Sequence, residues 1–363
     1  MVKHLVKERV ATLRFSPAVL ASPLLPEEAP ALFTFMKKRE ALRCAKVAGE
    51  PFPWSDDEIL NSYKFTNVKR EHDYTTSWMR EHFTIHAAHA TAGVTVFNCA
   101  LFRIFGTTQM AARVGWTSTP YNAEAVELAA LECRNEHGHA FTPAYCLPAY
   151  NSEISSAESA KRTYERVCRK YLQAVWDRRE LLGQACATGS WRALIDVLRA
   201  TPGFGGSGFM AKEVTLDVMQ TPHLRHCIDR NDWCPVGPGA RRGLNRLHGR
   251  PTAQCVGVNG GACEARFLSE LRALYGALVE AEPEWCHGLQ IELHDVQFQL
   301  CEFDKYERIR KREGGKKTKY YRGQRQPDAW GGGTSLCGAA SHVVKRGERP
   351  GALGAWEQSQ PNL

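Results

Sequence analysis

The chain has 363 residues, which is long enough for one large domain or two smaller ones with a sizeable core. Hydrophobic residues make up 43% and charged residues 24%, a balance typical of globular proteins that excludes a wholly disordered chain. The longest apolar stretch, residues 92–102, contains Asn98 and ends at Arg103, so it cannot cross a bilayer. We find no secretory signal, and the thirteen scattered cysteines form no CxxC pair, which predicts reduced thiols in a cytoplasmic protein.

The net charge of +8 is concentrated in one segment. Residues 305–325 contain ten lysines and arginines and two acids, whereas bases and acids balance over the rest of the chain. Such a local excess of bases favours contact with a phosphate backbone or another acidic surface. A solvated tail without a partner explains the charge equally well.

The elements expected along the chain are nearly all helices. Residues 27–49 have acids early, bases late and a closing glycine, which predicts a helix. Ser55 precedes three acids and is the expected N-cap of the next helix. The apolar stretch 94–105 favours a helix because it is long and flanked by helical segments. Further helices are expected over residues 75–89, 122–133, 155–187, 191–200, 209–219, 263–281 and 292–312.

The predicted class is therefore all-α, since no hairpin signal stands between regularly alternating apolar residues. Residues 1–313 are expected to form one helical catalytic domain. From residue 314 the sequence becomes rich in glycine, proline and bases and poor in core-forming residues. Residues 314–363 are therefore expected to be a mobile basic tail.

A glycine-rich turn joins two predicted helices in WRALIDVLRATPGFGGSGFMAKEVTLDVM, residues 191–219. Glycines permit positive φ angles and expose backbone N–H groups, and the second helix directs its N-terminal dipole toward the turn. This pattern is typical of a helix-hairpin-helix, which binds a DNA backbone without reading its sequence. A simple helix end closed by glycine is the alternative interpretation.

Other local patterns indicate charged sites. Arg241 and Arg242 follow a Gly-Pro-Gly turn where a helix can begin, so they are candidates for binding a phosphate, or else lie in an exposed basic loop. Glu302 and Lys305 are neighbours on one helix face and form either a solvated ion pair or part of a pocket. His82, His86 and His89 share a face of the predicted helix 75–89 but have no fourth ligand of suitable spacing, so no metal site is predicted.

The segment KFTNVKREHDYTTSW, residues 64–78, mixes basic, acidic and aromatic residues without a clear core face. Asn67, Arg70 and Asp73 are spaced three apart, so they can present one polar face to a substrate. Alternatively, Arg70 and Asp73 pair structurally while the aromatic residues pack inside.

Several long blocks, in the same order, resemble one known family. The chain is similar in these blocks to the α-glutamyl/putrescinyl-thymine pyrophosphorylase family of bacteriophages, whose helical domain is shared with the phage 5-hydroxymethyldeoxyuridine DNA kinases. The resemblance extends from about Phe33 to Arg310. The blocks are PWSDDEILNSYKFTNVKREHDYTTSW (53–78), VFNCALFRIFG (96–106), GFGGSGFMAKEVTLDV (203–218), GPGARRGLNRL (237–247) and DVQFQLCEFDKYER (295–308).

The resemblance implies a fold related to helix-hairpin-helix DNA glycosylases and a role in thymine hypermodification. In such pathways a kinase phosphorylates the hydroxymethyl group on C5 of uracil in DNA, and a pyrophosphorylase-type enzyme replaces the phosphate or diphosphate with an amine. The chain contains no P-loop pattern GxxxxGK[ST], which favours an amino acid:DNA transferase. The implied partners are double-stranded DNA containing 5-phosphomethyl-deoxyuridine and an amine, with glycine as the first choice. No cofactor is required, and the expected location is the cytoplasm of an infected host.

The chemistry implied by the resemblance assigns a role to each candidate residue. Cations must stabilise the departing phosphate, a carboxylate must take the proton of the amine, and a further cation must hold an amino-acid carboxylate. Extruding the base from the duplex requires compensating contacts to the DNA backbone. The candidates are Arg241, Arg242 and Lys305 for the phosphate, Asp217 and Glu302 for the proton, Arg103 for the carboxylate, Asn67, Arg70 and Asp73 for the substrate, and Lys69, Gly203, Gly205, Lys212, Arg308, Arg310 and Lys311 for DNA.

Two other functions fit the same sequence. A glycosylase acting on a modified thymine would share the fold and would need a catalytic aspartate after the hairpin, where Asp229 and Asp232 are candidates. The arginine pair Arg241 and Arg242 in that region instead favours a phosphate leaving group. A non-catalytic helical DNA-binding module would tolerate neutral substitutions at Asp217 and Glu302.

Overall fold

The computed structural model describes residues 24–145, 148–255 and 260–313, so the predicted tail at 314–363 lies outside the described residues. Within these ranges the chain is helical and has no β-strand, which confirms the all-α class. None of the described helices is long and apolar enough to cross a membrane. The finer assignment to a helix-hairpin-helix glycosylase fold stays a prediction.

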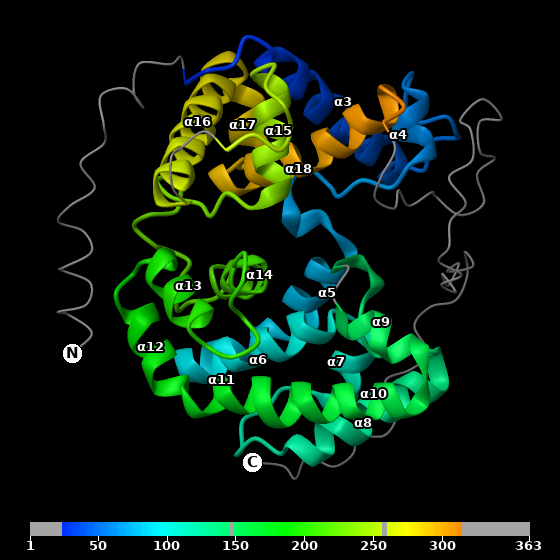
Figure 1. The fold of residues 1–363 in the computed structure, drawn as a ribbon, viewed down its shortest axis with the longest axis vertical. Helices are drawn as coiled ribbons and strands as arrows, with labels where there is room; N and C mark the ends of the chain where they lie inside the picture. Colours follow the sequence, from blue (N-terminus) through cyan, green and yellow to red (C-terminus); the bar gives the residue numbers. More distant parts are fainter. Residues whose placement is uncertain (1–23, 146–147, 256–259, 314–363) are drawn as a thin grey trace.

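The helices lie in two halves, one above the other in Figure 1. The upper half combines the two ends of the described chain, and the middle of the sequence forms the lower half. The upper helices are α3 (Ala29–Val47), α4 (Glu58–Ser62), α15 (Pro238–Leu247), α16 (Gly260–Ala281), α17 (Pro283–Leu289) and α18 (Leu293–Arg310). The lower helices are α5 (Tyr74–His82), α6 (Ala92–Phe105), α7 (Thr108–Val114), α8 (Ala123–His137), α9 (Pro148–Ser155), α10 (Ala157–Arg166), α11 (Gln173–Asp177), α12 (Arg179–Ala187), α13 (Trp191–Arg199) and α14 (Phe209–Val218).

Helix α6 is the core helix of the lower half. Nearly all its residues are buried, and it packs against α12 and α14. Thr91 caps its first turn and Gly106 ends it in the left-handed conformation, at a φ of 67°. At Gly93 the helix meets α12 so closely that a Cβ atom would lie 2.0 Å from the carbonyl oxygen of Arg179. Only glycine allows this approach.

Helix α18 is the core helix of the upper half, as α6 is of the lower half, and it packs against α15, α16 and α3. Its N-terminus is fixed by Asp295, whose carboxylate accepts a hydrogen bond from the backbone N–H of Glu292 at 2.9 Å. Gly243 of α15 lies against its backbone, since a Cβ there would be 2.3 Å from the carbonyl oxygen of Leu300. One side of α18 therefore contacts α15. Another side contacts the segment between α4 and α5, which leads into the lower half.

Most of the predicted helices are confirmed, but three details of the prediction are wrong. Asp57 rather than Ser55 caps α4, because its side chain accepts hydrogen bonds from Ile59 and Leu60. The predicted helix 155–187 changes to a π-helical turn at Val167–Leu172 and is interrupted at Arg178. The predicted helix 75–89 ends at His82 and continues as the 3-10 turn Thr84–His89, so the three histidines do not share one α-helical face. Helices α7, α9 and α17 have weak sequence signals and were not predicted.

Candidate functional site

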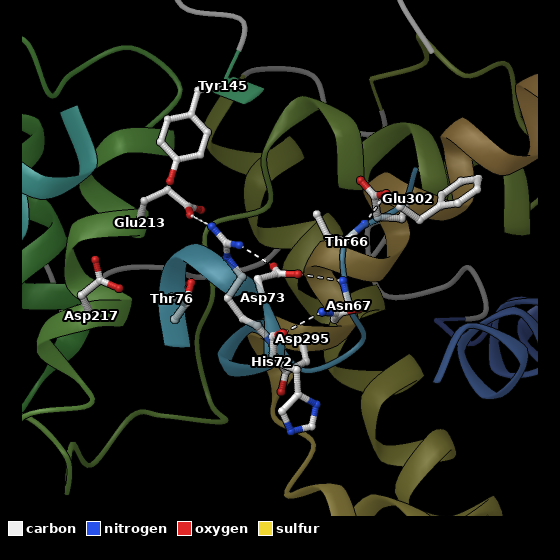
Figure 2. A network of polar contacts seen from close by, with 12 residues as sticks. Thr66, Asn67, His72, Asp73, Thr76, Tyr145, Glu213, Asp217, Asp295 and Glu302 are labelled. Atoms are coloured by element: carbon white, nitrogen blue, oxygen red, sulfur yellow. Dashed lines mark hydrogen bonds and ion pairs between the residues drawn. The ribbon is translucent and has the colours of Figure 1, made fainter. Parts of the chain in front are cut away.

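The chain between α4 and α5 connects the two halves and holds much of the predicted site (Figures 1 and 2). Only Arg70–His72 form a short 3-10 turn here, so other backbone groups need side-chain partners. The backbone N–H of Thr66 donates to Glu302 at 3.0 Å, and Gln299 donates to the carbonyl of Asn67 at 2.9 Å. Side chains of α18 thus fix a segment that lies more than two hundred residues earlier in the sequence.

Arg70 joins this segment to the lower half. Its guanidinium donates to Asp73 at 2.5 Å and to Glu213 of α14 at 2.7 Å. Asp73 also accepts a hydrogen bond from the backbone N–H of Asn67 at 3.0 Å (Figure 2). Although burial opposes it, the Glu213 carboxylate raises the pKa of Arg70, which keeps the guanidinium charged. Arg70 and Asp73 are thus paired, as the alternative interpretation held, and Glu213 joins them, while substrate contact by Asn67, Arg70 and Asp73 stays a prediction.

Arg103 and Asp217 form a second ion pair, in the core of the lower half. Two guanidinium nitrogens of Arg103 donate to the two carboxylate oxygens of Asp217, each at 2.5 Å. The remaining donors of Arg103 bind the hydroxyls of Tyr145 at 3.0 Å and Thr76 at 3.1 Å. Burial raises the pKa of the Asp217 carboxyl, against the opposing effect of Arg103. Two residues predicted for separate roles are thus bound to each other, and both oxygens of Asp217 are occupied.

Lys69 points into the upper half rather than to the surface. Its ammonium donates to Asp295 at 3.1 Å and to the carbonyl of Gln290 at 2.7 Å, and the residue is 7% exposed. Asp295 also lies 3.4 Å from a ring nitrogen of His294, which is buried between Asp295 and Glu292. Burial opposes protonation, but the two carboxylates raise the pKa of His294. This structure gives Lys69 an internal ion pair.

Glu302 and Lys305 form the predicted pair, at 2.6 Å. The ammonium of Lys305 also donates to the carbonyl of Lys64 at 2.8 Å and lies over the ring of Phe65. The side chain of Lys305 is 20% exposed and that of Glu302 is 14% exposed, so water and a ligand can reach them. The pair is therefore a more accessible acid and cation than Arg103 and Asp217.

The arginines of α15 are held by acids. Arg241 pairs with Glu264, and Arg242 donates through Nε to the buried Asp304 at 2.8 Å. Arg246 binds the same aspartate at 2.7 Å, and Arg308 lies 3.5 Å from it. Arg246 also binds Glu313, so three guanidiniums share two carboxylates, which leaves a local excess of positive charge. A third of the Arg242 side chain is exposed, and its terminal nitrogens have no hydrogen bond to the described residues.

A glycine-rich turn joins α13 to α14, as the sequence predicts. Gly203 adopts a φ of 88°, where only glycine is comfortable, and a Cβ there would lie 2.5 Å from the ring of Tyr171. Gly205 lies close to the carbonyl of Arg199 and is not in the left-handed region. Arg178 donates to the carbonyl of Ala200 at 2.7 Å. The turn is thus compact, and DNA binding by it stays a prediction.

The other predicted DNA-binding cations have different surroundings. Lys212 is 4% exposed, donates to Gln297 at 2.7 Å and lies 3.6 Å from the centre of the Phe298 ring. Arg310 and Lys311 are about half exposed at the end of α18, where both contact Glu307. Lys212 is therefore buried whereas Arg310 and Lys311 are exposed, and DNA binding by any of them stays a prediction.

The sequence analysis missed Glu213, Tyr145 and Asp295, which connect the predicted residues to one another. Glu213 directly follows Lys212 on a predicted helix, so the sequence shows a carboxylate there. It does not show that the carboxylate binds Arg70, which lies far away along the chain. Asp229 has a structural role, since its carboxylate accepts hydrogen bonds from Ser190 and from the backbone N–H of the first α13 residues. No group of three or more potential metal ligands gathers among the described residues.

A family model and a phage relative both match this chain, and their descriptions agree. Residues 28–316 match the family model described as "5-hmdU DNA kinase, helical domain". A "5-hmdU DNA kinase" of Bacillus phage SP10 is 26% identical over 211 residues, covering 54% of this chain. The matched region spans 32% of that relative, about a third of its length. No solved structure shows a significant match.

Proposed function

Because the chain belongs to the family of the 5-hmdU DNA kinase helical domain, we propose that it acts in thymine hypermodification of phage DNA. The specific proposal is a transferase that replaces the phosphate or diphosphate of 5-phosphomethyl-deoxyuridine in duplex DNA with an amine, glycine first. The family match over residues 28–316 supports the coarser proposal, a role in thymine hypermodification. The printed kinase name belongs to a relative of which only 32% is matched, so the reaction is argued from residues of this chain.

The reaction needs a cation at the leaving group and a base for the amine. As the C–N bond forms at the methylene, the C–O bond to phosphate breaks, and the electron pair leaves with the phosphate. Lys305 and Arg242 suit the phosphate because each retains exposed surface. Glu302 suits the proton, since one of its oxygens binds Lys305 and Thr66 while the other has no hydrogen bond to a described residue. The products are the aminomethyl base and free phosphate.

Arg103 and Asp217 support the site indirectly in this proposal. Both oxygens of Asp217 bind Arg103, so a role as free base would require the pair to separate. Separating two buried charges costs several kcal/mol. We therefore favour Glu302 over Asp217 as the proton acceptor, and the Arg103 pair as an element that fixes Thr76 and Tyr145.

DNA binding would use both halves. The end of α18, with Arg308, Arg310 and Lys311, and the exposed Arg242 form a basic surface suited to phosphates. The glycine turn around Gly203 and Gly205 would contribute backbone N–H groups. Extrusion of the target base costs a few kcal/mol, which these contacts would offset.

The relative's name favours a second candidate, in which this domain serves phosphorylation of 5-hydroxymethyl-deoxyuridine rather than amine transfer. The described residues would then bind the unphosphorylated base, and no amine would be used. A glycosylase and a non-catalytic DNA-binding module are further alternatives, distinguished by their products.

Mass spectrometry of nucleosides tests the proposal. The protein is incubated with a duplex containing 5-phosphomethyl-deoxyuridine and glycine, and the digested DNA is analysed. A new nucleoside in which glycine replaces phosphate, dependent on both reactants, would support the transferase. Released free base would indicate a glycosylase. A duplex containing 5-hydroxymethyl-deoxyuridine with ATP tests phosphorylation in parallel, and unchanged nucleosides in all reactions would refute catalysis with these substrates.

Two variants link the activity to the site. Glu302→Gln removes the proposed base while keeping the size of the side chain, and it should lower kcat by about 100-fold or more. Glu132→Gln is a matched control, because Glu132 is an exposed partner of Arg113 far from the network. Equal activity of both variants would exclude Glu302 as the base.

A further inference from the structure

The ion pair between Arg70 and Glu213 contains one unused acceptor and one unused donor. Glu213 is 1% exposed, and its Oε1 atom is buried without a hydrogen-bond partner among the described residues. The ammonium of Lys212 lies 3.7 Å from Oε1, beyond hydrogen-bond distance. The Nε atom of Arg70 is also buried without an acceptor. The side chains are joined by the 2.7 Å contact between their other atoms.

Asp217 and Asp73 lack this property. Both oxygens of Asp217 bind Arg103, and both oxygens of Asp73 accept hydrogen bonds, from Arg70 and from the backbone of Asn67. Glu71 also has a buried oxygen without a partner, but its other oxygen binds Gln220, away from Arg70. A buried polar atom without a hydrogen bond typically costs about 1–3 kcal/mol. A ligand that supplied both missing partners would recover this cost.

We propose that the Arg70–Glu213 pair binds the imide edge of the extruded pyrimidine. The N3–H of a thymine-type base would donate to Glu213 Oε1, and an adjacent carbonyl would accept from Arg70 Nε. This inference rests on the proposed function, because it takes the ligand to be a base flipped out of DNA. It assigns base recognition to Glu213, which the sequence analysis did not identify.

The charge of Glu213 makes the pair selective. Burial raises its pKa, but the charges of Arg70 and Lys212 outweigh this and hold the pKa below its ordinary value. An ionised carboxylate only accepts hydrogen bonds. A thymine-type base offers a donor at N3, whereas cytosine offers a lone pair there and would be repelled. The pair should therefore admit uracil derivatives and reject cytosine derivatives.

The network borders solvent beside Glu213, and a base would reach the buried Oε1 and Nε atoms by displacing the side chains that cover them. Arg70 and Asp73 retain side-chain exposures of 14% and 17%, so the network reaches solvent beside Glu213. Tyr145 lies close to Glu213 in Figure 2, and its hydroxyl accepts a hydrogen bond from Arg103 at 3.0 Å. The guanidinium of Arg70 lies over the Phe298 ring, 5.2 Å from its centre.

The test compares two duplexes in a binding assay without catalysis. One carries 5-hydroxymethyl-deoxyuridine opposite an abasic site, and the other carries its N3-methyl derivative in the same position. Because neither base is paired, the duplexes differ at the protein only at N3, where the methyl group removes the donor and adds bulk, and the Glu213→Gln variant separates these two effects. Fluorescence anisotropy should give a Kd about 10- to 100-fold lower for the unmethylated duplex, the range for a hydrogen bond to a charged group.

Glu213→Gln should lose most of this preference, while Glu71→Gln should keep it because the Glu71 carboxylate binds Gln220 and not the Arg70 guanidinium. Melting temperatures of both variants verify that they are folded. Tight binding of both duplexes with equal Kd by the wild-type protein would refute base reading by Glu213 and leave DNA modification intact. Failure to bind any duplex would refute the proposed function as well. A preference that Glu213→Gln retains in full would also overturn the inference.

Discussion

The Asp217→Asn substitution should destabilise the protein severely. Arg103 and Asp217 are 1% and 3% exposed and share two hydrogen bonds of 2.5 Å. The substitution leaves the Arg103 charge buried without compensation, and breaking such a pair typically costs about 3–5 kcal/mol. Since a domain has a total stability of about 5–15 kcal/mol, the loss is a large fraction of it. Urea denaturation at pH 7, followed by circular dichroism at 222 nm, measures the change.

Two controls decide whether buried charge is the cause. Glu158→Gln breaks an ion pair with Arg162 that is largely exposed, at 78% and 68%, and should cost less than about 1 kcal/mol. Replacing both buried partners, Arg103→Met with Asp217→Leu, should give a more stable protein than Asp217→Asn alone, because no charge is left unpaired. The reasoning is refuted if Asp217→Asn costs no more than Glu158→Gln in the same denaturant series.

Three further predictions concern other parts of the molecule. Gly243→Ala should lower the free energy of unfolding in urea by about 1–3 kcal/mol, because the new methyl would meet the backbone of Leu300. Gly276→Ala lies in open space within α16 and should raise it by up to about 1 kcal/mol. Equal effects of the two variants would contradict the close packing at Gly243. Because the pKa of His294 is raised in the folded state, its protonation stabilises the fold fully below pH 6.5, and this contribution is lost as the pH rises through the folded-state pKa. His294→Gln should therefore lose less stability between pH 6 and pH 9 than the wild type. Arg242→Ala should weaken duplex binding and reduce the slope of log Kd against log salt by about 1, whereas an unchanged slope would show that Arg242 contacts no phosphate.

Local sequence patterns were sufficient for the helices and for short-range partners. Helix α13 begins at Trp191 and ends at Arg199, as its amphipathic pattern and the following Pro-Gly turn predict. The pair of Glu302 and Lys305 follows from their spacing on one helix. Patterns failed where two signals compete, as at residues 55–58, where several capping residues stand together and Asp57 caps α4 instead of Ser55.

The sequence alone determined the all-α class, the basic segment at 305–325 and the residue types of the polar network, because these depend on composition and on neighbours along the chain. Only the tertiary structure decided the partners. Arg103 and Asp217 were assigned separate roles and are bound to each other across more than a hundred residues, and Arg70 of the connecting segment likewise meets Glu213 of α14. Attraction between charges depends on distance in space and on exclusion of water, and neither is written in local spacing.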